Sequence, residues 1–170
     1  MTIQRCQWCM HDEALQHYHD HIWGHAKQTD EALFEALTFE AFQSGLKWET
    51  IYRKREGFRE AFAQFNIEAV SQFTAEKQET LRNNPAIIRH RLKIAATVYN
   101  ASQIVRIQAE HGSFLHYLET LPESERIQAL SKQFKFIGPI SAESFLMACG
   151  YIRPRHEETC FLFPYKNAIV

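Results

Sequence analysis

The chain has 170 residues and a formal net charge of −1, with 45% hydrophobic and 23% charged residues. This composition excludes disordered and fibrous proteins, and the length suffices for one domain with its own hydrophobic core. The balanced charge argues against a general nucleic-acid coat protein, but a local basic surface can still bind DNA. We therefore expect a single domain over residues 1–170.

The sequence also indicates a compartment. No stretch approaches the roughly 20 apolar residues that span a bilayer, and residues 1–6 lack the apolar run of a secretory signal peptide. We therefore expect no membrane association and a cytoplasmic location. In that compartment, clustered Cys and His residues favour metal binding over disulfide bonds.

Hydrophobic spacing predicts an all-α fold. From residue 30 onward apolar residues recur at spacings of three and four, and no segment shows sustained alternation of period two. Asp30 is expected to cap the first of these helices, and Gly45 to end it. Further helices are expected from Trp48 through Arg55, at 59–62, 75–82, 89–110 and 113–119, and as a final pair joined at Gly138 and Pro139. The buried stripe of the helix at 89–110 is expected to consist of Ile94, Val98, Ala101, Ile104 and Val105.

Cys and His residues near both chain ends form a candidate metal site. Cys6 and His19 are separated by twelve residues, and His156 and Cys160 by three. The second pair is spaced so that both side chains point the same way on a helix or tight turn. Two thiolates and two imidazoles are the closed tetrahedral ligand set of a structural zinc ion. Spacing alone leaves open that these are unrelated thiols and surface histidines.

Two further cysteines complicate this site. Cys9 forms a CxxC pattern with Cys6 and could compete as a ligand. Cys149 lies between Ala148 and Gly150, and we interpret it as a buried apolar thiol.

Aromatic residues and one carboxylate indicate a second candidate site. Trp8, Trp23 and Trp48 all lie in the first 48 positions, as does Glu40, which interrupts a mostly apolar helix. Aromatic rings and a buried acceptor suit a flat, cationic, hydrogen-bonding ring such as a methylated purine. The alternative is that the tryptophans are core residues and Glu40 lies at a helix edge.

The segment around Gly138 is a candidate backbone-binding hairpin. A glycine in a tight turn before a helix N-terminus presents free N–H groups, which suit a phosphate. Such an element contacts DNA backbone without reading sequence. An ordinary pair of antiparallel helices is the alternative.

The chain resembles the bacterial 3-methyladenine DNA glycosylase I family along almost its whole length. The matching strings are Arg5-Cys6-x-Trp8, Tyr18-His19-Asp20-x-x-Trp23-Gly24, Phe39-Glu40-x-x-Gln43-Ser44-Gly45-Leu46-x-Trp48, Lys54-Arg55-Glu56-x-Phe58-Arg59, Ile87-Ile88-Arg89-His90-Arg91-x-Lys93-Ile94, Phe134-Lys135-Phe136-Ile137-Gly138, Ser144-Phe145-x-x-Ala148-Cys149-Gly150 and His156-x-x-x-Cys160. They occur in the same order as in the family, which makes the resemblance specific.

The resemblance implies a divergent helix–hairpin–helix glycosylase fold in which a structural zinc joins the termini. The implied zinc ligands are Cys6, His19, His156 and Cys160. The implied base-binding residues are Glu40 as the pocket carboxylate and Tyr18, Trp48, Trp8 and Trp23 as aromatic neighbours. The implied DNA-binding residues are Gln43, Gly45 and Leu46, in the turn that fills the gap left by a flipped base, and Gly138 in the hairpin.

The resemblance also implies an activity, which is excision of 3-methyladenine from alkylated double-stranded DNA by base flipping. Free 3-methyladenine is the expected product, and the expected enzyme is a monomer. It would be monofunctional, because no lysine follows the hairpin in a position to form a Schiff base. The catalytic Asp of many other helix–hairpin–helix glycosylases has no candidate here.

Several residues depart from the family pattern. Leu15 replaces a pocket tyrosine, Lys47 replaces a serine, and Ala41 replaces a glycine. The stretch between residues 118 and 134 is also shorter than in the family. These differences motivate the alternative of a catalytically silent relative that binds DNA or a protein partner. A zinc hydrolase is disfavoured, because four protein ligands leave no position for water.

Overall fold

The computed structural model describes residues 3–163, and these fold into ten α-helices and two short 3-10 helices, without a strand. The all-α prediction is confirmed for this part of the chain. The elements are η1 (Gln7–Cys9), α1 (Glu13–His21), α2 (Asp30–Gln43), α3 (Trp48–Arg53), α4 (Arg55–Ala61), η2 (Ala63–Phe65), α5 (Ile67–Ser71), α6 (Ala75–Arg82), α7 (Arg91–His111), α8 (Phe114–Thr120), α9 (Glu123–Gln133) and α10 (Pro139–Ala148).

The chain divides into two compact units. The terminal unit combines residues 1–26 with residues 146–170, and the central unit consists of residues 27–145. The boundary falls within α10. The expected single domain over residues 1–170 stays a prediction.

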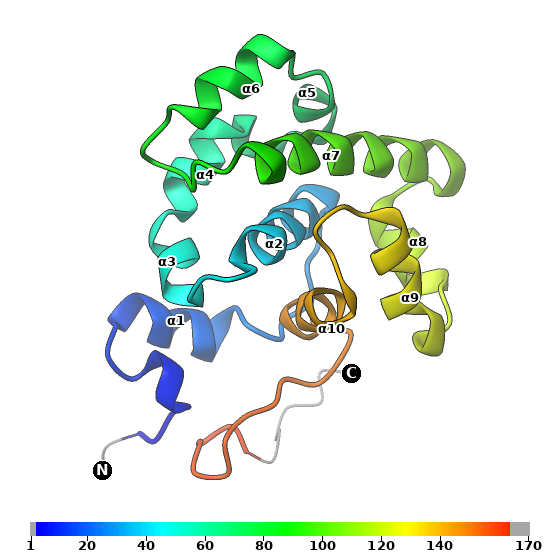
Figure 1. Cartoon of the computed structure of the whole chain (residues 1–170). Helices are drawn as coiled ribbons and strands as arrows, with labels where there is room; N and C mark the ends of the chain where they lie inside the picture. Colours follow the sequence, from blue (N-terminus) through cyan, green and yellow to red (C-terminus); the bar gives the residue numbers. More distant parts are fainter. Residues whose placement is uncertain (1–2, 164–170) are drawn as a thin grey trace. The chain divides into compact units, whose positions relative to one another are not determined.

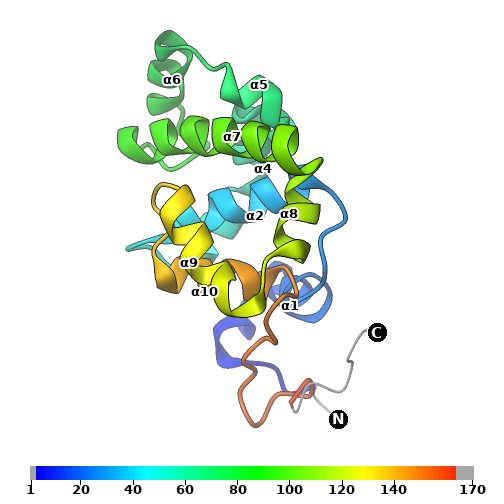
Figure 2. The ribbon, with the colours of Figure 1, turned by 90° about the vertical axis from the view of Figure 1, so that its right-hand side faces the viewer.

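Phenylalanine dominates the core of the central unit. In both ribbon views α7 lies between α2 on one side and α5 and α6 on the other (Figures 1 and 2). The rings of Phe34, Phe42, Phe58, Phe62 and Phe65 are at most 1% exposed, and those of Phe42 and Phe58 lie 4.8 Å apart at a steep angle. Edge-to-face contacts of this kind stabilise the packing of α2 against the segment that follows it.

The start of α2 differs from the prediction. The cap is Thr29, whose hydroxyl accepts a hydrogen bond from the backbone N–H of Ala32 at 3.1 Å, and Asp30 is the first helical residue. The Asp30 carboxylate instead accepts hydrogen bonds from the Gln108 side chain at 2.8 Å and from the backbone N–H groups of Phe114 and Leu115, each at 2.9 Å. Asp30 therefore accepts the first two N–H groups of α8, beside that helix's own cap Ser113, instead of capping α2. Local sequence does not encode this long-range contact.

Two other elements differ from prediction. Arg55 begins α4 instead of ending α3, so the helix expected at 59–62 starts earlier. A short helix at Ile67–Ser71 was not predicted. The helix expected at 75–82 is confirmed.

The buried face of α7 is more polar than the predicted stripe. Ile94, Ala101 and Ile104 are buried as expected, whereas Val98 and Val105 are half-buried. Their places on the buried face are taken by residues that include Lys93, Thr97 and Asn100. Buried polar side chains require hydrogen-bond partners. Thr97 donates to the Lys93 carbonyl of its own helix, whereas Lys93 and Asn100 bond distant segments of the chain.

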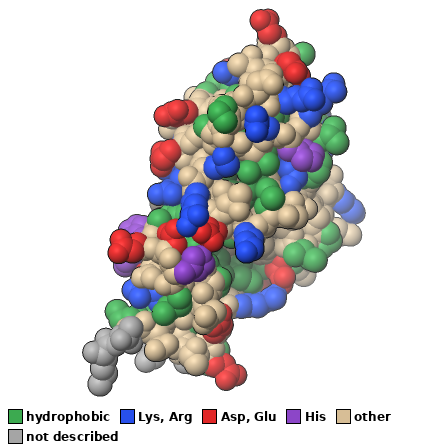
Figure 3. Space-filling model, turned by 60° about the vertical axis from the view of Figure 1, so that its left-hand side comes forward, with side chains coloured by type: hydrophobic (Ala, Val, Ile, Leu, Met, Phe, Trp, Pro, Cys, Tyr) green, Lys and Arg blue, Asp and Glu red, His purple; other side chains and the backbone are tan. Residues whose placement is uncertain are grey.

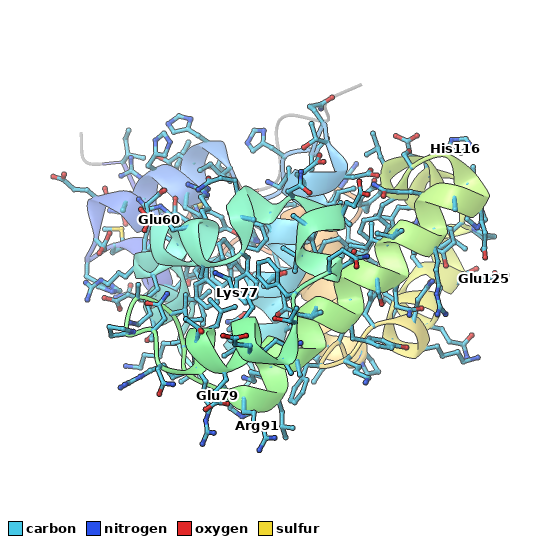
Figure 4. The ribbon with its side chains drawn as sticks, turned by 90° about the horizontal axis from the view of Figure 1, so that it is seen from above. Glu60, Lys77, Glu79, Arg91, His116 and Glu125 are labelled. Carbon is cyan, nitrogen blue, oxygen red and sulfur yellow. The ribbon has the colours of Figure 1, made fainter. Side chains whose placement is uncertain are left out.

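Most charged side chains lie at the surface. Glu79, Arg91, His116 and Glu125 point outward from four different helices of the central unit (Figure 4). On the face drawn in Figure 3, Lys and Arg side chains lie among Asp and Glu side chains. Within residues 3–163, Glu40 and Lys93 are the two buried residues of these charged types.

Within the same residues, no helix has the length and apolar character needed to cross a membrane.

Candidate functional site

The terminal unit brings the four predicted metal ligands together. The ligand atoms of Cys6, His19, His156 and Cys160 all lie within 4.8 Å of one another. The Cys160 sulfur is 3.5 Å from His19 Nε2 and 3.6 Å from His156 Nδ1, which is itself 3.6 Å from the Cys6 sulfur. Sulfur and nitrogen atoms bound tetrahedrally to zinc at about 2.3 and 2.05 Å lie about 3.6 Å apart. The donor atoms therefore have the spacing of a closed zinc site.

Asp20 and Arg5 orient one of these ligands. His19 Nδ1 is 2.8 Å from an Asp20 carboxylate oxygen, and the Arg5 guanidinium contacts the same carboxylate at 2.8 to 3.1 Å. Donation of the Nδ1 proton to Asp20 leaves the Nε2 lone pair directed at the cluster. Burial would raise the pKa of Asp20, but hydrogen bonds from Arg5 and His19 outweigh it and lower that pKa. Neither residue was assigned a role from the sequence, although Asp20 directly follows a predicted ligand.

Burial keeps the thiol of Cys6 protonated and the imidazole of His156 neutral when no metal is bound. Burial raises the pKa of the Cys6 thiol to about 12, and burial followed by the charge of His19 lowers the pKa of His156 to about 4. The imidazole is thus neutral and available as a donor at neutral pH. Two thiolates at this site need a bound cation to offset their charge.

Cys9 does not belong to the cluster. Its thiol is fully buried and donates a hydrogen bond to the Cys6 carbonyl at 3.1 Å. Burial also raises the pKa of Cys9, to about 11. The CxxC alternative therefore has no support in the geometry. Cys149 is buried just beyond α10, as predicted.

The aromatic residues of the terminal unit pack around the metal ligands. Trp8 contacts Tyr18, His19 and Trp23, with ring centroids 6.2, 5.5 and 5.6 Å apart, respectively. Trp23 lies 5.0 Å from the ring of His156. The indoles of Trp8 and Trp23 thus touch the ligand imidazoles directly, and Trp8 also touches the buried ring of Tyr18.

Gly24 allows the ligand-bearing C-terminal segment to approach closely. It adopts a φ of +82°, and a Cβ at this position would lie 2.2 Å from Pro154 Cγ. Its backbone N–H also donates to the Ala148 carbonyl at 3.1 Å. Any larger residue would displace the chain two residues before His156.

Glu40 occupies a buried position in α2 of the central unit. It is 5% exposed, and the Ser144 hydroxyl of α10 donates a hydrogen bond to Oε1 at 3.0 Å. Burial raises the pKa of this carboxyl to about 7, against the smaller lowering effect of Ser144. The helix-edge alternative for Glu40 is therefore wrong. A carboxyl with a pKa near 7 in a buried place is typical of functional sites.

The residues after α2 form a tight turn. Leu46 N–H donates to the Gln43 carbonyl at 2.7 Å, Ser44 has φ −48° and ψ 116°, and Gly45 has φ +81°. These angles define a type II turn, which requires a positive φ at its third residue. Leu46 follows with 39% of its side chain exposed. Trp48 begins α3 beyond the turn, packed against Phe39 at a centroid distance of 6.3 Å.

Gly138 lies in the exposed connection between α9 and α10. A side chain at this glycine would meet nothing within 4 Å, and α10 starts directly after it at Pro139. The preceding residues are positioned by Asn100, whose side chain donates to the Lys135 carbonyl at 3.1 Å and accepts from the Lys135 N–H at 2.8 Å. Sequence reasoning also missed Asn100, because a polar residue on a helix face does not indicate its distant partner.

Comparison with known proteins identifies the family. The family model for methyladenine glycosylases matches residues 8–133. The chain is 32% identical over 184 residues to DNA-3-methyladenine glycosylase 1 of Escherichia coli strain K12, covering 95% of this chain and 98% of that protein.

Solved structures agree with this match. The fold is similar to a crystal structure of 3-methyladenine DNA glycosylase I, with a TM-score of 0.85 and 32% identity, covering 95% of this chain and all of that one. It is also similar to the Staphylococcus aureus enzyme studied for recognition of 3-methyladenine, with a TM-score of 0.83 and 33% identity, covering 98% and 100% of the two chains. The extent of these matches shows that the chain belongs to the methyladenine glycosylase family of DNA repair enzymes.

Proposed function

We propose that this glycosylase releases 3-methyladenine from alkylated double-stranded DNA as a monofunctional enzyme. The observation that carries the proposal is Glu40, a buried carboxyl whose pKa lies near 7, at the position where the family has its pocket carboxylate. The relatives' names and complexes support 3-methyladenine as the base.

The reaction requires the protein mainly to bind the DNA and to flip the methylated nucleotide out of the duplex. Methylation at N3 places a positive charge on the purine, which makes the base a good leaving group. The bond between the sugar and the base breaks, and its electron pair passes to the purine as neutral 3-methyladenine. A water oxygen bonds to the sugar carbon, and the proton of that water is lost to solvent. A strong general base is not required, which is consistent with the absence of a catalytic Asp candidate.

Within this proposal Glu40 recognises the cationic base. An ionised carboxylate in a buried site attracts a cation strongly, because little water screens the interaction. We assign stacking of the base to Trp48 and Tyr18, with Trp8 and Trp23 as supporting aromatics. Leu15, which stands where the family has a pocket tyrosine, is buried.

Two elements of the central unit would contact the DNA. We assign Gln43, Gly45 and Leu46 to the gap left by the flipped nucleotide, because the type II turn leaves Leu46 partly exposed after α2. We assign Gly138 to the phosphate backbone, in a helix–hairpin–helix made by α9 and α10. The exposed backbone at Gly138 supports this assignment.

We further propose that Cys6, His19, His156 and Cys160 hold a structural zinc ion. The sulfur–nitrogen spacings support zinc, and the ion would supply a cross-link between segments from the two ends of the chain. The four donors leave no position for a reactive water, so base release is assigned to other residues.

A base-release assay tests the proposed activity. The purified protein is incubated with methylated duplex DNA, and the released bases are separated by chromatography. We expect free 3-methyladenine to appear, to fall markedly with Glu40→Gln, and to be unaccompanied by strand cleavage. A parent protein that binds the duplex but releases no base above a heat-inactivated control would instead be a catalytically silent relative.

A further inference from the structure

Besides Glu40, Lys93 is the second charged residue that is buried in the central unit. It is 5% exposed and lies in the first turn of α7. Its Nζ donates hydrogen bonds to the Phe42 carbonyl at 2.8 Å and to the Ser44 carbonyl at 2.9 Å. Burial lowers the pKa of Lys93. A cation at the last carbonyls of α2 is also favoured by the helix dipole.

The orientation of the Ser44 carbonyl distinguishes a type II turn from a type I turn. The peptide between the second and third residues of a type II turn is flipped by about 180° relative to type I, as the dihedral angles of the two types require. In this turn that peptide joins Ser44 to Gly45. A donor fixed at the Ser44 carbonyl therefore stabilises the type II form and disfavours type I. Lys93 supplies such a donor from a different helix.

The same helix also contacts the other proposed DNA-binding element. Lys93 Nζ lies 6.0 Å from the centroid of the Phe136 ring, and Asn100 hydrogen-bonds both backbone groups of Lys135. One face of α7 thus holds the turn at residues 43–46 and the connection at residues 134–138. The two loops are held by one rigid element.

We propose that Lys93 is a positioning residue for base flipping: it selects the type II turn that presents Leu46 to the gap in the DNA. This inference rests on the proposed function. Lys93 acts through the turn, and it has no direct part in holding the base. Its loss should therefore impair insertion into duplex DNA while leaving recognition of the free base intact.

The first test is Lys93→Met, which keeps the apolar stem and removes the donor. Base release from methylated duplex is expected to fall by about tenfold or more, because misplacing a group that positions the substrate is costly. Binding of free 3-methyladenine, followed by tryptophan fluorescence, should stay within about twofold of the parent. The control is Thr97→Val, a buried change one turn further along α7, where the hydroxyl bonds only the Lys93 carbonyl among the contacts described. This variant should release base like the parent.

Two further variants exclude a merely structural effect. Gly45→Ala meets no atom within 4 Å but opposes the positive φ, so it should reproduce the loss even if Lys93→Met does not fold. Lys93→Met combined with Leu46→Ala should release base no more slowly than Leu46→Ala alone, because both changes remove the same insertion.

Three results would overturn the role of Lys93: parent-like base release by Lys93→Met, parent-like release by Gly45→Ala, or additive losses in the double variant. Failure of the proposed function is distinguishable, because the parent itself would then release no base. In that case the test compares how strongly the parent and Lys93→Met prefer a duplex with an abasic-site analogue over an intact duplex. Lys93→Met should lose this preference, and retention of it would contradict the proposal.

Discussion

Glu40 and Lys93 are buried ionisable residues of the same unit, but they differ in the hydrogen bonds that compensate their burial. Lys93 is offered two backbone carbonyls within hydrogen-bond distance, which offset part of the cost of burying its charge. Glu40 receives a single hydrogen bond from a neutral hydroxyl, that of Ser144, and its pKa rises to about 7. The ionised form of Glu40 is therefore poorly compensated, and binding of a cation would stabilise it.

The burial of Glu40 predicts that the free energy of unfolding depends on pH. Burial raises the Glu40 pKa from 4.5 to about 7, so the unfolded chain loses this proton at lower pH than the folded protein. The contribution of Glu40 to the free energy of unfolding therefore falls as pH rises from 4.5 to about 7, by up to roughly 3 kcal/mol. Glu40→Gln removes this dependence and retains an acceptor for Ser144.

Urea unfolding of the parent and Glu40→Gln at several pH values between 5 and 8 measures the effect. The stability of Glu40→Gln relative to the parent should increase over this range. A constant difference between the two proteins would show that Glu40 is not desolvated in the folded state.

At the scale of elements, α2 organises the central unit at both of its ends. Its C-terminal carbonyls accept hydrogen bonds from Lys93 of α7, and its first residue, Asp30, accepts three hydrogen bonds from α7 and α8. Asp30 thereby ties the start of α2 to the junction between α7 and α8.

We predict that Asp30→Ala lowers the free energy of unfolding by about 2 kcal/mol, since it leaves the N–H groups of Phe114 and Leu115 without their acceptor while the local cap Ser113 stays in place. Asp30→Asn keeps one oxygen acceptor and should cost less. The neighbouring Glu31 is exposed, and Glu31→Gln should change stability by less than about 0.5 kcal/mol. Denaturant unfolding compares the three variants, and equal effects at positions 30 and 31 would contradict the role of Asp30 as an acceptor for α8.

At the scale of the whole molecule, the metal cluster lies in one unit only. That unit is assembled from the two ends of the chain, and among its described residues one α-helix, α1, lies entirely within it, together with the end of α10. With so little regular structure, the proposed zinc cross-link between residues 6–19 and 156–160 would carry much of its stability. The central unit has its own phenylalanine core.

We therefore predict that zinc removal loosens the two units unequally. After chelation, amide hydrogen exchange should accelerate in α1 while α7 keeps its protection, because local stability follows local contacts. Cys160→Ser should lower the zinc content and reproduce this pattern.

Cys9→Ser is the matched control, since Cys9 is equally buried but lies outside the cluster. It should retain zinc at the parent's level. Unchanged metal content in Cys160→Ser, together with loss in Cys9→Ser, would reverse the assignment of the ligands.

Features with a local physical cause could be predicted from the sequence. The helical class followed from hydrophobic spacing, and the helix expected at 75–82 has the observed bounds. The candidate ligands Cys6, His19, His156 and Cys160 were predicted from residue type and resemblance, because few side chains can hold a metal, and the structure brings their ligand atoms together. Glu40 was noticed because a carboxylate in an apolar helix is costly unless it serves a purpose.

Long-range partnerships were decided by the tertiary structure alone. Asp30 looked like a cap for its own helix but accepts N–H groups of α8, and Lys93 and Asn100 gave no sign in the sequence of the loops that they hold. Asp20 stands next to a predicted ligand, yet its contact with Arg5 spans fifteen positions. Hydrophobic period and local capping reflect interactions within a few residues, whereas the partner of a buried polar group depends on which distant segment packing brings within hydrogen-bond distance.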